Sequence, residues 1–554
     1  MSPPPPRQER PLFTRPSVRP IPRRPRPVAR RRRPLLFAGI TAGLVLTLAA
    51  GCTVGPSSRP DLAVFGDVPA ASSTPTSIPL GPGGPGQPGE FAGGWQSCES
   101  LDDPIDGASA FETACARMLV PVDRAAPTGT DLAMQVGRAR RSGLPADAPT
   151  LVVVDAAGPL EGALAGANRV ANIAATLPRA ITDRYQVVVP DVRGAVSSGV
   201  STCWRDYPLT YLYTLDADPT ATGAAARLLD VTRAFTFGCQ DYVGPEMAFF
   251  GTAQAADDLD SLRSALQQDR LDLLGTGYGA TLGAVYADRY PGRVGRLALD
   301  SPSDHAAPPA DRAVTSAAGY EKSLQAFTAD CATRADCALG TDATTATAAL
   351  TTAMTTLDAG GISTDDVTLG SSAALWALIM ALPDRSRWPA LATAIAETAR
   401  GDGTALTDLL SSLVSDPRAA VSARTMLDCN DSDERLADSD LPTRFADART
   451  TAPTFGAFLV AVASLCRQWP TPDAPLAALR GEGAAPVLVV GGIDDPVAPG
   501  AGARAVAGQL ASAQLISYPG PEHGGYRRSD CVTTAVDNYL LDGTLPAADT
   551  LCPA

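Results

Sequence analysis

The segment from Leu271 to Tyr290 limits the possible folds of this chain more than any other feature. It begins with a short apolar run, passes through the turn Gly-Thr-Gly-Tyr-Gly at residues 275–279, and continues in an Ala-rich stretch of helical spacing. A strand that enters a helix through a tight glycine-rich turn is typical of a parallel sheet flanked by helices, because parallel strands need long crossover connections. The segment therefore predicts an α/β fold.

Further apolar runs extend this prediction. The predicted strands are Met118–Val122, Leu132–Val136, Leu151–Val154, Gln186–Val189, Leu271–Leu274, Arg296–Leu299, Val487–Val490 and Gln514–Ser517. The first two form an antiparallel lead-in, and the last six form the centre of a mostly parallel sheet. Between the fourth and fifth of these six central strands, residues 305–480 have a mostly helical pattern. We therefore predict a lid domain over 305–480, inserted into a core made of residues 95–304 and 481–554.

The first 51 residues predict export. Residues 1–33 hold eleven arginines and one glutamate, and an uncharged stretch of 18 residues, Pro34–Gly51, leads into Cys52. This order is that of a bacterial secretory signal, and its end, LAAGC, resembles bacterial lipoproteins, so we expect lipidation at Cys52 and a place on the outer face of the membrane. An uncleaved transmembrane anchor is the alternative, because 18 apolar residues can just span a bilayer. Sec and twin-arginine export both stay open.

Composition restricts the partners of the mature chain. Residues 53–94 contain eight prolines and many Gly and Ser residues, which predicts a flexible tether over 52–94. The whole chain has a net charge of −14 and its first 33 residues have +10, so the remainder has −24. Nucleic acid is therefore excluded as a partner, because binding it needs a positive surface.

The cysteines predict a disulfide framework. Ten cysteines remain besides Cys52, and disulfides persist in exported proteins. Grouped along the chain they suggest five short-range bridges, although the sequence leaves other connectivities open: Cys98–Cys115, Cys203–Cys239, Cys331–Cys337, Cys429–Cys466 and Cys531–Cys552. We expect no metal site and no cofactor, because the chain has no C-x-x-C motif and only two histidines.

Three separated features define a candidate site. The turn at 275–279 has the context of a nucleophile elbow, G-x-S-x-G, with Gly277 at its centre. Asp495 follows the predicted strand Val487–Val490, and His523 follows the strand Gln514–Ser517. The order of elbow, acid and histidine is that of α/β-hydrolases.

These features resemble the secreted actinobacterial tripeptidyl aminopeptidase family, relatives of proline iminopeptidase within the α/β-hydrolases. The resemblance covers most of residues 95–554. Its motifs are LDLLGTGYGATLGAVYADRYPGRVGRLALD at 271–300, DVRG at 191–194, ADDLD at 256–260, DPV at 495–497 and VDNYLLDGTLP at 536–546. The resemblance implies an α/β-hydrolase fold with a helical lid, and an exopeptidase that removes short peptides from free N-termini.

The chain departs from the family pattern at two places. Gly277 stands at the position of the nucleophilic serine. The family's oxyanion loop aligns with residues 155–160, where only Gly158-Pro159 matches. The resemblance would give the oxyanion donors to Tyr278, Ala157 and Gly158, while Asp155 would repel a negative oxygen there.

The departures predict a catalytically impaired hydrolase homologue that binds a peptide, another small molecule or a protein partner in its cleft. The alternative is an active exopeptidase in which His523 and Asp495 activate water. In a third hypothesis the domain is a scaffold whose surface alone matters. Thr276 is a poor substitute nucleophile, because its side chain should point away from the central position of the turn.

The sequence also predicts the surroundings of several other side chains. His305 is expected to be a solvent-exposed loop residue. Asp431, Asp433 and Glu434 are expected on a solvated surface, although they could attract a peptide's amine. Three tryptophans, Trp376, Trp388 and Trp469, could line a pocket under the lid, but the spacing of the aliphatic residues Leu375, Ile379 and Leu382 favours ordinary lid core.

Overall fold

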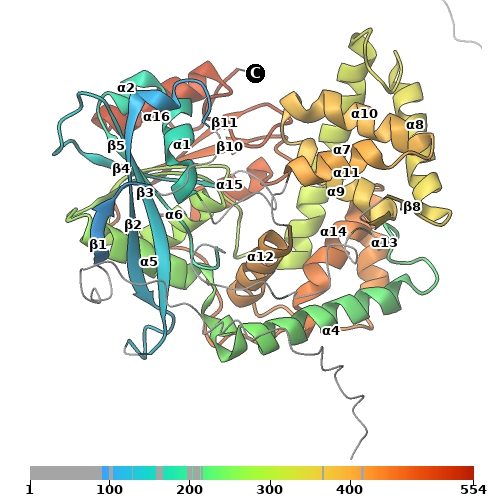
Figure 1. The fold of residues 1–554 in the computed structure, drawn as a ribbon, viewed down its shortest axis with the longest axis horizontal. Helices are drawn as coiled ribbons and strands as arrows, with labels where there is room; N and C mark the ends of the chain where they lie inside the picture. Colours follow the sequence, from blue (N-terminus) through green and yellow to red (C-terminus); the bar gives the residue numbers. More distant parts are fainter. Residues whose placement is uncertain are drawn as a thin grey trace, which may run out of the picture. The chain divides into compact units, whose positions relative to one another are not determined.

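A ten-stranded mixed sheet organises the chain (Figure 1). The computed structural model describes residues 90–98, 104–127, 129–156, 166–195, 203, 213, 216–364, 367–413 and 417–553. The strand order is β1-β2-β3-β5-β4-β6-β7-β10-β11-β12. The strands are β1 (Phe91–Gln96), β2 (Phe111–Pro121), β3 (Asp131–Arg141), β4 (Thr150–Ala156), β5 (Gln186–Pro190), β6 (Leu271–Gly277), β7 (Val294–Asp300), β10 (Val487–Gly492), β11 (Ala513–Tyr518) and β12 (Thr550–Leu551).

All eight predicted strands are confirmed. The strands β2 and β3 pair antiparallel, as the lead-in prediction required. The six central strands β5, β4, β6, β7, β10 and β11 are parallel to one another, and β5 also pairs antiparallel with β3. Their carboxyl ends therefore meet at one edge of the sheet, where α/β proteins place their ligands.

Helices cover both faces of the sheet, as alternate residues of one strand show. Leu151 and Val153 of β4 share a buried cluster with α1 (Val170–Thr176) and α16 (Asp530–Asp542). Val152 and Val154 share another with α5 (Thr252–Ala265), α6 (Tyr278–Arg289) and α15 (Gly500–Gln509). Because successive side chains of a strand point to opposite faces, a central strand buried on both faces is apolar throughout.

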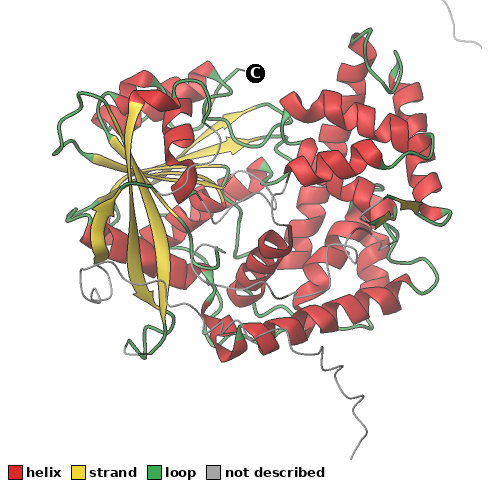
Figure 2. Ribbon diagram, viewed as in Figure 1, coloured by secondary structure: helices red, strands yellow, loops and turns green. Residues whose placement is uncertain are grey.

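The region between β7 and β10 is mostly helical and lies to one side of the sheet (Figure 2). Its helices are α7 (Pro309–Thr333), α8 (Ala343–Asp358), α9 (Ser371–Ala381), α10 (Trp388–Ala399), α11 (Thr404–Leu413), α12 (Pro417–Asp431), α13 (Leu441–Thr451) and α14 (Gly456–Ala463). A small hairpin, β8 (Ile362–Ser363) with β9 (Thr368–Leu369), interrupts them. This lid has its own apolar core, which includes Trp376 and Trp388.

Among the described residues before the elbow, two further helices are α2 (Arg179–Thr182) and α4 (Ala224–Tyr242). Residues 76–554 form one unit, so the lid and the sheet are parts of the same body. Among the residues that the structure describes, no helix combines the length and the apolar character that a membrane crossing needs. Cys52 and the predicted signal lie outside the described residues.

The five predicted disulfides are confirmed: Cys98–Cys115, Cys203–Cys239, Cys331–Cys337, Cys429–Cys466 and Cys531–Cys552. They fit a protein that folds in an oxidising compartment outside the cytoplasm.

The predicted end of the tether at residue 94 is wrong. Residues Phe91–Gln96 form strand β1, which pairs antiparallel with β2. The rings of Phe91 and Trp95 lie 4.8 Å apart, and the guanidinium of Arg138 in β3 lies 4.3 Å from the ring centroid of Trp95. The pairing with β2 and the contact with Arg138 hold in place a glycine-containing strand that has no local pattern of its own.

Candidate active site

The glycine-rich turn has the backbone of a nucleophile elbow. Gly277 ends β6 and precedes α6 with φ 57° and ψ −115°, a conformation that a residue with a Cβ adopts only with strain. A Cβ at Gly275 would lie 2.3 Å from the Gly279 carbonyl oxygen, and one at Gly279 would lie 2.0 Å from that of Val154. Gly275 and Gly279 are therefore required by this sharp turn, and at Gly277 a glycine avoids backbone strain.

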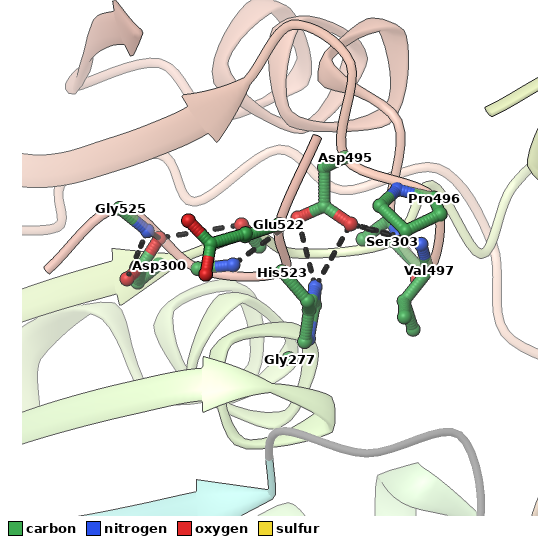
Figure 3. A network of polar contacts seen from close by, with 12 residues as sticks. Gly277, Asp300, Ser303, Asp495, Pro496, Val497, Glu522, His523 and Gly525 are labelled. Atoms are coloured by element: carbon green, nitrogen blue, oxygen red, sulfur yellow. Dashed lines mark hydrogen bonds and ion pairs between the residues drawn. The ribbon is translucent and has the colours of Figure 1, made fainter. Parts of the chain in front are cut away.

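Asp495 and His523 form a buried pair near this turn (Figure 3). The Nδ1 atom of His523 lies 2.8 Å and 2.9 Å from the two carboxylate oxygens of Asp495. Asp495 follows β10, and its Oδ1 accepts hydrogen bonds of 2.9 Å from the amides of Val497 and Ala498. The acid is thus held by its own loop and orients the imidazole, as the acid of a catalytic triad does.

The other ring nitrogen of His523 is a buried polar atom without a partner. Figure 3 shows the imidazole between the carboxylate of Asp495 and Gly277. Its Nε2 has no hydrogen-bond partner among the described residues. Burial alone would lower the pKa of His523, but the charge and hydrogen bond of Asp495 outweigh burial and raise the pKa above its ordinary value. The imidazole is thus oriented for acid–base chemistry, while Gly277 offers no side chain to receive it.

Asp300, at the end of β7, holds the histidine loop in place. Its carboxylate accepts hydrogen bonds from the amides of Gly525 at 2.9 Å and Tyr526 at 2.8 Å. The amide of His523 itself donates to the carbonyl of Pro383 in the lid at 3.1 Å. The position of the imidazole therefore depends on both the sheet and the lid.

Two cavities lie between the sheet and the lid. The smaller, about 50 Å³, is lined by Gly277, Tyr278, His305, Asp431 and His523 among others. The larger, about 320 Å³, has mostly apolar walls that include Trp376 and Ile379. Six residues line both: Ser303, Arg312, Arg424, Asp428, Val497 and Ala498. A cavity of this size next to an acid–base pair is a typical ligand site.

The expectation that His305 is exposed is wrong. His305 is only 7% exposed, and it lines the same small cavity as His523. Its Nε2 lies 3.1 Å from the carbonyl oxygen of Ala477, and burial lowers its pKa below the ordinary value. The Pro- and Ala-rich neighbourhood of His305 gives no local sign of this burial, because residues 477 and 523 are distant in the sequence.

Asp431 is likewise not on a solvated surface. Its carboxylate accepts hydrogen bonds from the amide of Thr252 at 2.7 Å and from the hydroxyl of Thr252 at 2.5 Å. The same hydroxyl lies 3.2 Å from the Tyr278 hydroxyl. Of its neighbours, Asp433 is exposed as expected, whereas Glu434 is half-buried and accepts from the amide of Ala310 at 3.0 Å. Asp431 and Glu434 thus connect α12, and the chain that follows it, to other elements.

Asp431 should make stability depend on pH. Burial, opposed by the bonds from Thr252, raises the pKa of Asp431 from 3.8 to about 6. The folded protein therefore binds the proton more tightly, and the free energy of unfolding should fall as the pH rises from about 4 through about 6. Asp431→Asn should remove up to about 3 kcal/mol of this fall. Thermal unfolding across this pH range measures it.

Asp433→Asn is a matched control for this prediction, since loss of that exposed carboxylate should change stability by less than about 0.5 kcal/mol. Parallel pH profiles for the wild type and Asp431→Asn would contradict the prediction.

The remaining predicted residues fall into two groups. Ala157 and Gly158 lie outside the described residues, so their place in an oxyanion hole stays a prediction. Tyr278 is the first residue of α6, where an amide N–H has no partner within the helix. Its assignment as an oxyanion donor also stays a prediction.

Two neighbouring side chains clarify the chemistry of the turn. Thr276 is buried and lines neither of the two cavities described above. Asp155 pairs with Thr276 across β4 and β6, and its Oδ2 lies 3.6 Å from Nη2 of Arg527. That ion pair offsets part of the repulsion that Asp155 would exert on an anion.

The tryptophans divide between the two roles considered for them. Trp376 lines the larger cavity, whereas Trp388 is 1% exposed and its Nε1 donates to the Leu382 carbonyl at 3.1 Å within the lid. Among the described residues, no group of three or more His, Cys, Asp or Glu side chains is arranged to hold a metal ion.

The sheet, the elbow and the ordered acid and histidine define an α/β-hydrolase. Residues 160–389 match the family model described as alpha/beta hydrolase fold, and residues 452–552 match the one described as TAP-like protein. The chain belongs to the TAP-like family of α/β-hydrolases.

Curated relatives cover nearly the whole chain. Carboxylesterase B of Mycobacterium tuberculosis is 31% identical, over 94% of this chain and 99% of its own length. Serine protease Hip1 of the same species is 29% identical over 84% of this chain and 91% of its own. Tripeptidyl aminopeptidase of Streptomyces lividans is 26% identical over 83% and 86%. The sequence resemblance to the tripeptidyl aminopeptidase family is thus confirmed.

Proposed function

We propose that this chain is an exported, lipid-anchored α/β-hydrolase homologue that binds peptides between its sheet and lid and has lost serine-nucleophile catalysis. The observation behind the proposal is Gly277, which keeps the elbow backbone and supplies no hydroxyl beside the His523–Asp495 pair. The names of two relatives, a serine protease and a tripeptidyl aminopeptidase, support peptides as the ligand class. The anchor would be a lipid on Cys52, with residues 53–90 as the tether.

A serine-directed fluorophosphonate tests the loss of catalysis. Purified protein should show no saturable labelling, because the triad supplies no serine oxygen to be phosphonylated. The relevant control is the protein after heat denaturation, which reveals unspecific labelling. Specific and saturable labelling of the native wild type would contradict the proposal.

The intact acid–histidine pair favours a second candidate, an exopeptidase in which His523 activates water. In that reaction a neutral Nε2 would take a proton from the attacking water and return it to the leaving amine. Turnover of a tripeptidyl chromogenic substrate, abolished by His523→Ala, would support it. Activity that persists unchanged in His523→Ala would end this candidate, since no other described histidine is held by a carboxylate in this way.

A further inference from the structure

Both histidines of the chain line one small cavity. The chain contains two histidines in 554 residues, and His305 and His523 both line the cavity of about 50 Å³ above Gly277. One lies on the loop after β7 and the other on the loop after β11. The candidate site described above gives His523 a role beside the elbow and Asp495. It gives no role to His305.

His305 presents a buried hydrogen-bond acceptor. Its Nε2 lies 3.1 Å from the carbonyl oxygen of Ala477, and a carbonyl only accepts, so the proton of the neutral ring is assigned to Nε2. The Nδ1 atom then has a free lone pair, and it is buried without a partner among the described residues. Because burial lowers the pKa of His305, the neutral ring is the favoured form.

His523 presents the complementary donor. Its Nδ1 is engaged by Asp495, and its Nε2 is buried and unpartnered among the described residues. The carboxylate of Asp495 stabilises the doubly protonated ring and raises its pKa, and in that form Nε2 is a donor. A buried donor and a buried acceptor therefore belong to side chains that line the same cavity, and each costs free energy while it stays unpaired.

We propose that the cavity above Gly277 binds a hydroxyl group brought by the ligand, the side chain of a serine or threonine residue in a bound peptide. A hydroxyl can accept a bond from Nε2 of His523 and donate one to Nδ1 of His305. A volume of about 50 Å³ has room for one such group. The ligand hydroxyl thus takes the place left by the missing serine oxygen.

The larger cavity would hold the remainder of the peptide. It shares a wall with the small cavity, in which Ser303, Arg312 and Val497 take part. This inference rests on the proposed peptide-binding function and adds to it a preference for one class of side chain. His305 becomes a ligand-contacting residue that the sequence did not reveal.

Two tripeptides test the inference on the full chain, purified without a histidine tag. Calorimetry should show that Ala-Ser-Ala binds at least about fivefold more tightly than Ala-Ala-Ala, the value of one net hydrogen bond. In protein labelled with ¹⁵N only at histidine, Ala-Ser-Ala should shift both imidazole signals. The two signals are assigned by their loss in single variants.

Two variants of His305 distinguish a direct contact with the ligand from an effect on folding. His305→Ala should remove the preference for Ala-Ser-Ala, whereas His305→Asn, which keeps a side-chain acceptor near the position of Nδ1, should retain part of it. If both peptides bind the wild type equally, peptide binding stands and the hydroxyl site is refuted. If neither peptide binds, both this inference and the proposed peptide binding fail.

Discussion

Gly277→Ser should give this protein serine hydrolase activity, which under our proposal the wild type does not have. The substitution places a hydroxyl at the centre of the elbow, near Nε2 of His523, which has no partner in the described part of the chain. A triad serine contributes up to about 10⁶ in turnover, and the loss of one oxyanion donor removes about 10²–10³ of this. We therefore expect turnover of a tripeptidyl chromogenic substrate to rise at least about 10³-fold, together with saturable fluorophosphonate labelling.

The same substitution should cost stability. At φ 57° a side chain strains the backbone by on the order of 1–3 kcal/mol, and Gly277→Ser should lower the free energy of unfolding by about that amount. Gly277→Ala is the matched control, because it introduces the same strain without a hydroxyl and should remain inactive. Chemical denaturation and labelling of both variants measure the two effects separately.

A folded Gly277→Ser variant with neither labelling nor turnover would contradict the prediction. The obstacle would then be the oxyanion loop and not the missing hydroxyl alone. Activity in Gly277→Ser that survives the further change His523→Ala would show that the new serine does not work through the acid–histidine pair.

Asp258→Ala should destabilise the fold more than any other single change discussed here. Asp258 in α5 is 1% exposed and accepts bonds of 2.8 Å from both Nε and Nη2 of Arg193, whose side chain is fully buried. The remaining Arg193 donors bond to three carbonyls: Pro121, Val122 and Phe249. Removal of the carboxylate leaves a buried, unpaired guanidinium, which costs about 3–5 kcal/mol.

A surface pair provides the control for this prediction. Glu112 and Arg140 form an ion pair of 2.6 Å between β2 and β3, with 56% and 31% of their side chains exposed. Because exposed pairs contribute about 0–1 kcal/mol, Glu112→Ala should have a small effect. Urea unfolding of the two variants makes the comparison, and equal midpoints would refute the structural role of the Arg193–Asp258 pair.

Local sequence patterns predicted the sheet well. The strands around Leu151 and Val487 are buried on both faces, so their uninterrupted apolar runs reflect this environment directly. The elbow could also be predicted from the sequence. Gly275 and Gly279 are required by close backbone contacts within the turn and with the adjoining strand β4. Asp495 and His523 could be placed because each follows a strand in the order that this fold uses.

Other features had no local pattern. Strand β1 contains two glycines with positive φ and is held by Trp95 against Arg138, more than forty residues away. The hydrogen bonds of Asp431 come from Thr252, and the burial of His305 involves the segment around Ala477. An acidic cluster and a Pro-rich loop look like surface in the sequence, because periodicity reports only which residues share one face of one element.

The amino-acid sequence alone was enough to predict the α/β class, the helical lid, the pairing candidates among the cysteines and the missing hydroxyl at residue 277. Each of these features was indicated by a pattern along the sequence: apolar runs, helical spacing, the order of the cysteines or a glycine-rich turn. That both histidines line one cavity and that Asp431 is bonded to Thr252 could be seen only in the folded chain. Those facts arise from contacts between loops separated by long stretches of chain, and the free energy of burial that produces them belongs to the assembled fold.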